Sequence, residues 1–152
     1  MTKTELREEV HDELTRMDTV VTELVHLRRD VGRAAPTLRE KVAGGAFLMQ
    51  FYNGTENILK RIARFHSVLL PRSDKWHAEL FEGFTADATP GLPVLFDDSL
   101  ANEMRAYRGF RHVVRSSYGV ELDWERMREG IDRLPMTFEQ FQHAVLRHLD
   151  GL

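Results

Sequence analysis

Apolar residues recur every three or four positions through the first thirty residues, and this period restricts the stretch to one long helix. The series consists of Val10, Leu14, Met17, Val21, Leu24 and Val31, with Arg28 interrupting it. Such spacing places all of them on one helical face, as either an intramolecular core or a dimer seam. Thr2 or Thr4 can cap the start, and Gly32 and Pro36 follow the end. We therefore predict a helix over residues 3–33.

The same periodic pattern predicts helices along most of the remaining chain. They are expected at residues 37–66, 74–81, 99–117, 123–134 and 136–149. Pro135 is expected to break the chain between the last two helices. Residues 83–98 combine glycines and prolines with apolar residues, which predicts an irregular segment packed onto the helices. The sequence therefore predicts an all-α bundle of four to six helices.

Length and composition set the remaining limits on this chain. Its 152 residues predict one domain, residues 1–152, with a long N-terminal helix (1–35) before a bundle core (37–150). The net charge of -3 means that a nucleic-acid site must be a local patch. Without cysteine, disulfides and thiol chemistry are excluded. No apolar run is long enough to span a membrane, and we expect a cytoplasmic protein.

Cationic side chains gather on one face of the predicted helix over residues 99–117. The cationic stripe consists of Arg105, Arg108, His112 and Arg115, flanked by Arg111 and Tyr118. At the helical period, the four stripe residues lie within roughly 80° of one another. Ala106, Phe110, Val113 and Val114 are expected on the opposite, buried face. Like charges at these spacings repel, so an anion is expected to offset the repulsion. A phosphodiester fits, because guanidinium groups match its oxygens and histidine exchanges protons near neutral pH.

Two other interpretations of this stripe stay open at the level of sequence. In the first, it is a solvated face whose arginines pair with Glu103, Glu121 or acids of neighbouring helices. In the second, the arginines pair with the acidic N-terminal helix. That arrangement predicts energetic coupling between Arg111 and Glu9.

The other histidines do not form a recognisable metal or catalytic pattern. Two Glu-x-x-His pairs, ending at His11 and His26, lie on one helix and about 22 Å apart, too far to share a metal. We expect no metal and no cofactor. The histidines expected at the surface or at helix ends are His66, His77, His143 and His148.

Several of these strings together resemble the HepT-like branch of the HEPN superfamily. The strongest is Tyr107 to Tyr118 (YRGFRHVVRSSY), followed by Leu122 and Asp123. The upstream strings FYNGTENILKRIA (51–63) and WHAEL (76–80) also resemble this branch, and the similarity spans about residues 40–150. The resemblance implies a small helical bundle, commonly a homodimer. It also implies a metal-independent endoribonuclease, a toxin paired with a minimal nucleotidyltransferase antitoxin that adenylylates a tyrosine.

The signature of the family is an arginine, four to six residues and a histidine, often with a tyrosine two residues later. In one register Arg111 and Tyr118 are the signature arginine and tyrosine, and Ser116 stands at the histidine position. In the other register Arg105 and His112 satisfy the spacing, but the tyrosine is missing. We favour the first register because it places the helix end as in the family.

The resemblance and the stripe together predict a site for RNA cleavage. We expect His112 to act as acid or base, Arg111 to stabilise the transition state, and Tyr118 to position RNA or accept the antitoxin's modification. The arginines expected to bind RNA phosphates are Arg105, Arg108 and Arg115. A two-fold dimer that joins two copies of this helix would complete the site. The alternative is a catalytically inactive helical protein that binds nucleotide, RNA or a nucleotidyltransferase partner.

Overall fold

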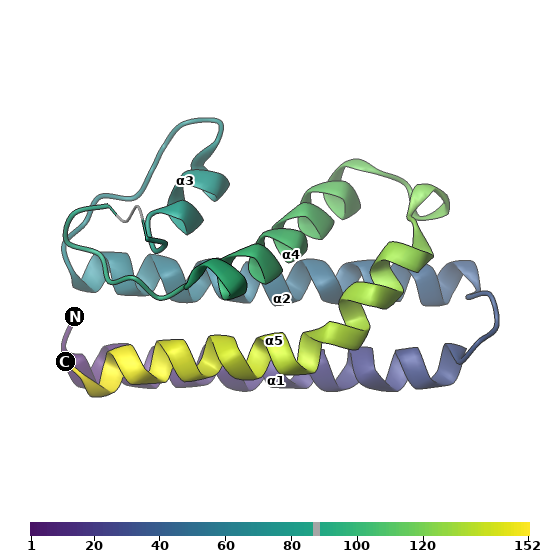
Figure 1. Ribbon diagram of the computed structural model, residues 1–152, viewed down its shortest axis with the longest axis horizontal. Helices are drawn as coiled ribbons and strands as arrows, with labels where there is room; N and C mark the ends of the chain where they lie inside the picture. Colours follow the sequence, from purple (N-terminus) through teal and green to yellow (C-terminus); the bar gives the residue numbers. More distant parts are fainter. Residues whose placement is uncertain (87–88) are drawn as a thin grey trace.

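The computed structural model describes residues 1–86 and 89–152, and these residues form helices and no strand, as expected (Figure 1). The elements are α1 (Lys3–Val31), α2 (Leu38–Phe65), α3 (Trp76–Glu82), α4 (Asp98–Ser116), the 3-10 turn η1 (Gly119–Glu121) and α5 (Trp124–Asp150). The all-α prediction is therefore confirmed. No helix in the described part of the chain is both long and apolar enough to cross a membrane.

The two longest helices begin with the same capping arrangement. At the start of α1, the Thr2 hydroxyl accepts a hydrogen bond from the backbone of Glu5, whose carboxylate accepts one from the backbone of Thr2. Thr37 and Glu40 repeat this at the start of α2. Each capping box satisfies two of the backbone N–H groups that a helix start leaves without partners.

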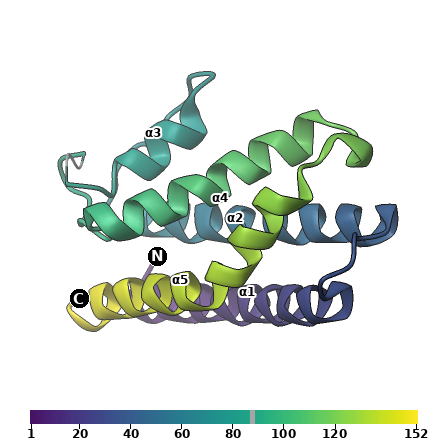
Figure 2. The same cartoon turned by 45° about the vertical axis from the view of Figure 1, so that its right-hand side comes forward.

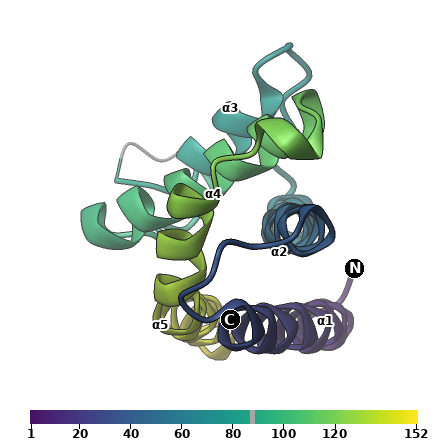
Figure 3. The same cartoon turned by 90° about the vertical axis from the view of Figure 1, so that its right-hand side faces the viewer.

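Helix α2 lies at the centre of the bundle. It packs against α1, α3, α4, α5 and η1, while α5 also runs beside α1 (Figures 1 and 2). Viewed along its length, the bundle has α1 and α5 side by side, with α2 and α4 stacked over them (Figure 3). The close approach of α1 requires Gly54, because a Cβ there would lie 2.6 Å from Cγ of Met17. The central position of α2 makes it the scaffold for any site formed with α3 and α4.

The apolar residues that recur along α1 form part of the intramolecular core. They are buried, with Val10 and Leu24 fully inaccessible. The interrupting residue, Arg28, forms an ion pair with Asp132 of α5, with its Nε 2.9 Å from the carboxylate. The break in the series is therefore a contact between helices.

The predicted break at Pro135 is wrong. Helix α5 continues through this proline from Trp124 to Asp150, and Figure 1 shows it changing direction along its length. A proline removes one backbone hydrogen bond and bends a helix, but packing can hold the chain helical on both sides. Leu134 and Phe138, on either side of Pro135, are both buried in the core.

Two helix starts differ from the expected positions. Helix α4 begins at Asp98, one residue earlier than expected, and Asp97 caps it, since its carboxylate accepts a hydrogen bond from the Leu100 backbone at 2.8 Å. Helix α3 begins at Trp76, two residues later than expected, with Ser73 bound to the backbone of Lys75 just before it.

The segment between α3 and α4 is irregular and packs onto the helices, as expected for residues 83–98. Phe84, Leu95 and Phe96 are buried in it. The part of this expectation that concerns residues 87 and 88 lies outside the described residues.

Candidate functional site

The structure divides the predicted cationic stripe of α4 into segments with different partners. The first two arginines turn toward the end of α3, where both meet Glu82. Arg105 donates to this carboxylate from Nε at 2.7 Å and from Nη2 at 2.8 Å, and Arg108 donates from Nη1 at 3.4 Å. The hydrogen bond from Arg105 is the main cause that lowers the pKa of Glu82, and the same bond raises the pKa of Arg105. For these two arginines, pairing with an acid of a neighbouring helix is therefore the arrangement found.

Arg111 turns instead toward α2 and is held there. Its Nε donates to the side-chain oxygen of Asn53 at 2.7 Å and lies 3.8 Å from Oε1 of Glu56. Its side chain is only 16% exposed. The two terminal nitrogens have no hydrogen-bond partner among residues 1–86 and 89–152. A guanidinium carries five donors in a fixed plane, so Arg111 is oriented through one nitrogen and keeps the others for an anion.

Glu56 is a buried carboxylate between two partners. Its side chain is 4% exposed; Oε1 faces Arg111, and Oε2 accepts a hydrogen bond from Nδ1 of His77 on α3 at 2.5 Å. Burying a carboxylate is costly unless it is paired and hydrogen-bonded, and both conditions are met here. A histidine that donates from Nδ1 keeps Nε2 available to accept or release a proton.

His77 lies in the first turn of α3, at a helix end as expected, but it is also partly buried and bound to Glu56, which was not expected. Its side chain is 21% exposed and its ring stacks on that of Trp76, with ring centroids 3.5 Å apart. Glu56, His77 and Arg111 thus form one group, which we call the Glu56 cluster, at the meeting point of α2, α3 and α4.

Tyr52 lies one helical turn before Glu56 and completes the surroundings of this cluster. Its hydroxyl is fully buried and has no hydrogen-bond partner within the described residues. Burial, and then the negative charge of Glu56, raise the pKa of Tyr52, while the charges of Arg108 and Arg111 oppose this shift. A buried polar atom without a partner is uncommon in folded proteins, and here it lies next to the candidate site.

The rest of the predicted site lies at the exposed end of α4. His112 and Arg115 are exposed, and the Tyr118 side chain, just before η1, is 81% exposed. Ser116, at the signature histidine position, donates from its hydroxyl to the backbone oxygen of His112 at 2.8 Å. The structure therefore places Arg111 in the Glu56 cluster, while His112 and Tyr118 face solvent.

The buried face of α4 differs in part from the expectation. Val113, expected inside, is 45% exposed, whereas Tyr107 is fully buried and donates to the backbone oxygen of Gly130 at 2.6 Å. The acidic residues of α1 do not contact the stripe; Glu9 pairs with Arg61 of α2, with 3.0 Å between the carboxylate and Nε. Pairing of Arg111 with Glu9 is therefore wrong.

Sequence reasoning missed Asn53, Glu56 and His77 because their contacts join three separate helices. One signal was available: Glu56 falls among the buried positions of α2, next to Thr55 and two positions before Ile58. A charged residue in a buried helical face usually has a specific partner. In the described part of the chain, no three histidine, aspartate or glutamate side chains are grouped as a metal site would require.

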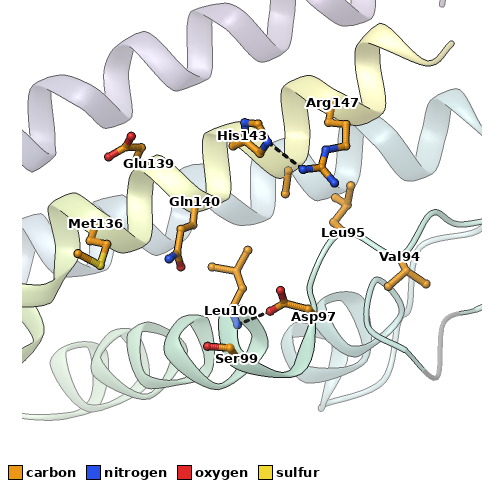
Figure 4. Close-up of a pocket in the computed structure, with 11 residues that line it drawn as sticks. Val94, Leu95, Asp97, Ser99, Leu100, Met136, Glu139, Gln140, His143 and Arg147 are labelled. Atoms are coloured by element: carbon orange, nitrogen blue, oxygen red, sulfur yellow. Dashed lines mark hydrogen bonds between the residues drawn. The ribbon is translucent and has the colours of Figure 1, made fainter.

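A pocket of about 690 Å³ lies apart from this region, between the start of α4 and the second half of α5 (Figure 4). His143 and Arg147 of α5 line one wall and contact each other, and Asp97 lines the opposite wall with its carboxylate on the backbone of Leu100. None of the residues predicted for the site lines this pocket.

The comparison with protein families identifies the class to which this chain belongs. The family described as HepT-like protein matches residues 43–152, which include α3, α4, α5 and most of α2. The chain therefore belongs to the HepT-like family, and the resemblance to this branch of the HEPN superfamily is confirmed. Comparisons with curated proteins and with solved structures found no match. All members of the Glu56 cluster lie inside the matched region, and α1 lies before it.

Proposed function

We propose that this chain is a HepT-like endoribonuclease that cleaves RNA without a metal ion. The observation that supports this most directly is the Glu56 cluster, in which one buried carboxylate holds both an arginine and a histidine. Cleavage of RNA requires a base, an acid and positive charge at the phosphate. Imidazole and guanidinium groups supply these functions.

The proposed reaction begins when a base takes the proton of the ribose 2′-hydroxyl. The 2′-oxygen attacks the phosphorus, and the 5′-oxygen leaves with a proton from an acid, which gives a 2′,3′-cyclic phosphate and a 5′-hydroxyl. His77 is the base, because Glu56 fixes its Nδ1–H and leaves Nε2 to accept the proton. Arg111, oriented by Asn53, stabilises the charge of the phosphorane through its terminal nitrogens.

One histidine cannot easily act as acid and base in the same step, so a second proton donor is needed. His112 adjoins Arg111 in sequence and is exposed, and we assign it the role of acid. We propose that a homodimer joins two copies of the α4 end and brings this residue to the site. The exposed apolar residues Val113 and Val120, which are 45% and 68% exposed, support an interface there.

The remaining predicted residues fit supporting roles in the same proposal. Arg115 is exposed and binds an RNA phosphate, whereas a phosphate that approaches Arg105 or Arg108 competes with Glu82. Tyr118 is exposed enough to contact RNA or to be modified by a nucleotidyltransferase. We therefore propose a cytoplasmic toxin whose antitoxin is a nucleotidyltransferase.

Incubation of the purified protein with a mixed RNA pool in EDTA tests this function. Arg111→Ala and His77→Asn are expected to abolish cleavage; the asparagine amide can still donate to Glu56 but cannot replace Nε2. His112→Ala is expected to abolish cleavage too if it supplies the acid. Arg39→Gln, an exposed arginine at the far end of α2, is the matched control. Cleavage that persists in Arg111→Ala and His77→Asn would refute the assignment.

A second candidate function is a HepT-like protein that binds RNA, nucleotide or a nucleotidyltransferase without cleaving RNA. Ser116 at the signature histidine position, and the pairing of Arg105 with Glu82, favour it. This alternative predicts binding that Arg111→Ala weakens, with no cleavage product under any condition.

A further inference from the structure

A second cationic surface lies beside the Glu56 cluster. It is a cleft of about 380 Å³ between the C-terminal half of α2, residues 70–72 and α3. Its charged lining consists of Lys60, Arg64 and Arg72, and none of its seven lining residues is acidic. Trp76 and three apolar side chains form the remaining wall. We call this surface the basic cleft.

The basic cleft continues the polar face of α2 that carries the Glu56 cluster. Asn53, Glu56, Lys60 and Arg64 follow one another at spacings of three, four and four, which places them within roughly 80° on the helix. The helical rise puts Lys60 about 6 Å and Arg64 about 12 Å beyond Glu56 along the axis. On α3, Trp76 of the cleft precedes His77 of the cluster. A strand lying along this face would pass the cluster and then the three cations.

Arg105, Arg108 and Arg111 of α4 each lie against an acidic side chain, whereas the cations of the cleft have no acidic partner within the described residues. Within the described ranges, Lys60, Arg64 and Arg72 form no ion pair. Lys60 and Arg64, four residues apart on one helix, repel each other. The ammonium of Lys60 lies 4.6 Å from the ring centroid of Trp76, which holds the charge at the cleft wall. This concentration of charge, on a chain of net charge -3, favours an anionic ligand.

We propose that the basic cleft binds backbone phosphates of a single-stranded RNA beside the position where the strand is cleaved. The inference rests on the proposed function, because that function supplies the RNA. Proteins bind single strands by combining cations along the backbone with aromatic rings, and the cleft has both. Arg64 and Arg72 bind phosphate oxygens through guanidinium nitrogens, and Trp76 offers its ring to a base when Lys60 moves onto a phosphate.

Binding of a fluorescein-labelled 2′-O-methyl oligonucleotide tests the proposal. The 2′-O-methyl group removes the attacking hydroxyl, so affinity is measured without cleavage. The logarithm of the binding constant falls linearly with the logarithm of the salt concentration. Each lost phosphate contact reduces the steepness of this slope by about 0.7 for a single strand. Lys60→Gln/Arg64→Gln should therefore lower it by about 1.4. Between 50 and 200 mM salt, the affinity of this variant should fall about sevenfold less than that of the wild type.

Matched variants separate local binding from the loss of charge and from unfolding. Arg39→Gln lies on the same helix, about 37 Å from Arg64 along the axis, and is expected to leave the slope unchanged. The chain has two tryptophans, Trp76 in the cleft and the buried Trp124. Oligonucleotide binding should quench the fluorescence of Trp76, and Trp76→Phe should remove this quenching. Circular dichroism melts test whether each variant is folded.

The possible outcomes distinguish this inference from the proposed function. A slope that is unchanged in Lys60→Gln/Arg64→Gln overturns the basic cleft as an RNA site, whether or not RNA is cleaved. Inorganic phosphate or AMP that competes as well as the strand also overturns it, since the cleft would then bind small anions. If the cleft instead binds an acidic protein partner, the variants should bind the oligonucleotide as the wild type does, and that result also overturns the inference. Cleft-dependent binding without cleavage supports the cleft and refutes the nuclease.

Discussion

Two buried tyrosines of this protein should respond in opposite directions to the loss of their hydroxyl groups. Tyr52 and Tyr107 are both fully buried, on α2 and α4. The Tyr107 hydroxyl donates to the backbone oxygen of Gly130 at 2.6 Å, whereas that of Tyr52 has no partner in the described part of the chain. A phenylalanine at either position keeps the ring and its packing. The pair therefore isolates the contribution of each hydroxyl group.

The expected magnitudes follow from the state of each hydroxyl. Burying an unpaired hydroxyl costs about 1–3 kcal/mol, and Tyr52→Phe removes that cost. We expect an increase of about 1 kcal/mol in the free energy of unfolding, equivalent to a rise in Tm of about 2–4 °C for a chain of this size. Tyr107→Phe loses a hydrogen bond worth about 0.5–1.5 kcal/mol, and the free energy of unfolding should fall by that amount.

Urea denaturation at pH 7, followed by circular dichroism, measures both effects. Burial raises the pKa of Tyr107 to about 12 and raises that of Tyr52 also, so both phenols are neutral at this pH. An unchanged m-value would show that the variants unfold between the same two states. The midpoints then report the stability differences directly.

A Tyr52→Phe variant that is less stable than the wild type would refute this reasoning. It would mean that the hydroxyl has a partner, such as an enclosed water molecule, that compensates its burial. A variant that is more stable but cleaves RNA more slowly would show that the hydroxyl acts in the site, at the expense of stability.

Three further perturbations test other parts of the structure. Gly54→Val should lower the free energy of unfolding by about 1–3 kcal/mol in a urea titration, because the valine side chain would overlap Met17 of α1. Equal stability would mean that Met17 moves aside. Burial, and then the charge of His66, lower the pKa of His148 in the folded protein below its ordinary value of 6.5. The unfolded chain keeps the ordinary value, so below pH 6.5 it binds more protons than the folded protein does. Stability should therefore fall as pH drops through 6.5 toward the folded pKa, and His148→Gln should flatten this dependence in thermal melts at pH 5 to 8; an unaltered profile would contradict it. Glu82→Gln should free Arg105 and strengthen oligonucleotide binding at low salt, and unchanged affinity would show that this arginine does not reach the strand.

The sequence predicts most of the fold because its helices carry local signals. The spacing of apolar residues on α1, and the Thr-x-x-Glu starts at Thr2 and Thr37, depend on neighbours within one or two turns. Pro135 shows the limit of this reasoning. A proline weakens a helix locally, but burial of Leu134 and Phe138 against the rest of the bundle keeps the helix continuous. Where a local signal is weak or contradictory, tertiary packing therefore determines whether the chain is helical.

The candidate site could be predicted only in part from the sequence, because it too depends on tertiary packing. The charge pattern on α4 correctly identified a cationic helix, and the structure places its Arg111 in the buried cluster. The pattern could not show that Arg105 is neutralised by Glu82, which lies 23 residues earlier on another helix. Nor could it show that His77 meets Glu56, 21 residues away. Such pairings depend on how α3 packs against α2 and α4.

The central position of α2 has a consequence for how fast different parts of this protein exchange their amide hydrogens. Amides exchange most slowly in elements that open only when the whole domain unfolds, and fastest in exposed connections. Helix α2, which packs against every other helix of the bundle, should belong to the first group, so Asn53 and Glu56 stand on a rigid frame. The connection over residues 66–75, which contributes Arg72 to the basic cleft, should belong to the second. Asn53 and Glu56, which hold Arg111 and His77, are then expected to stay fixed while one wall of the basic cleft opens more readily.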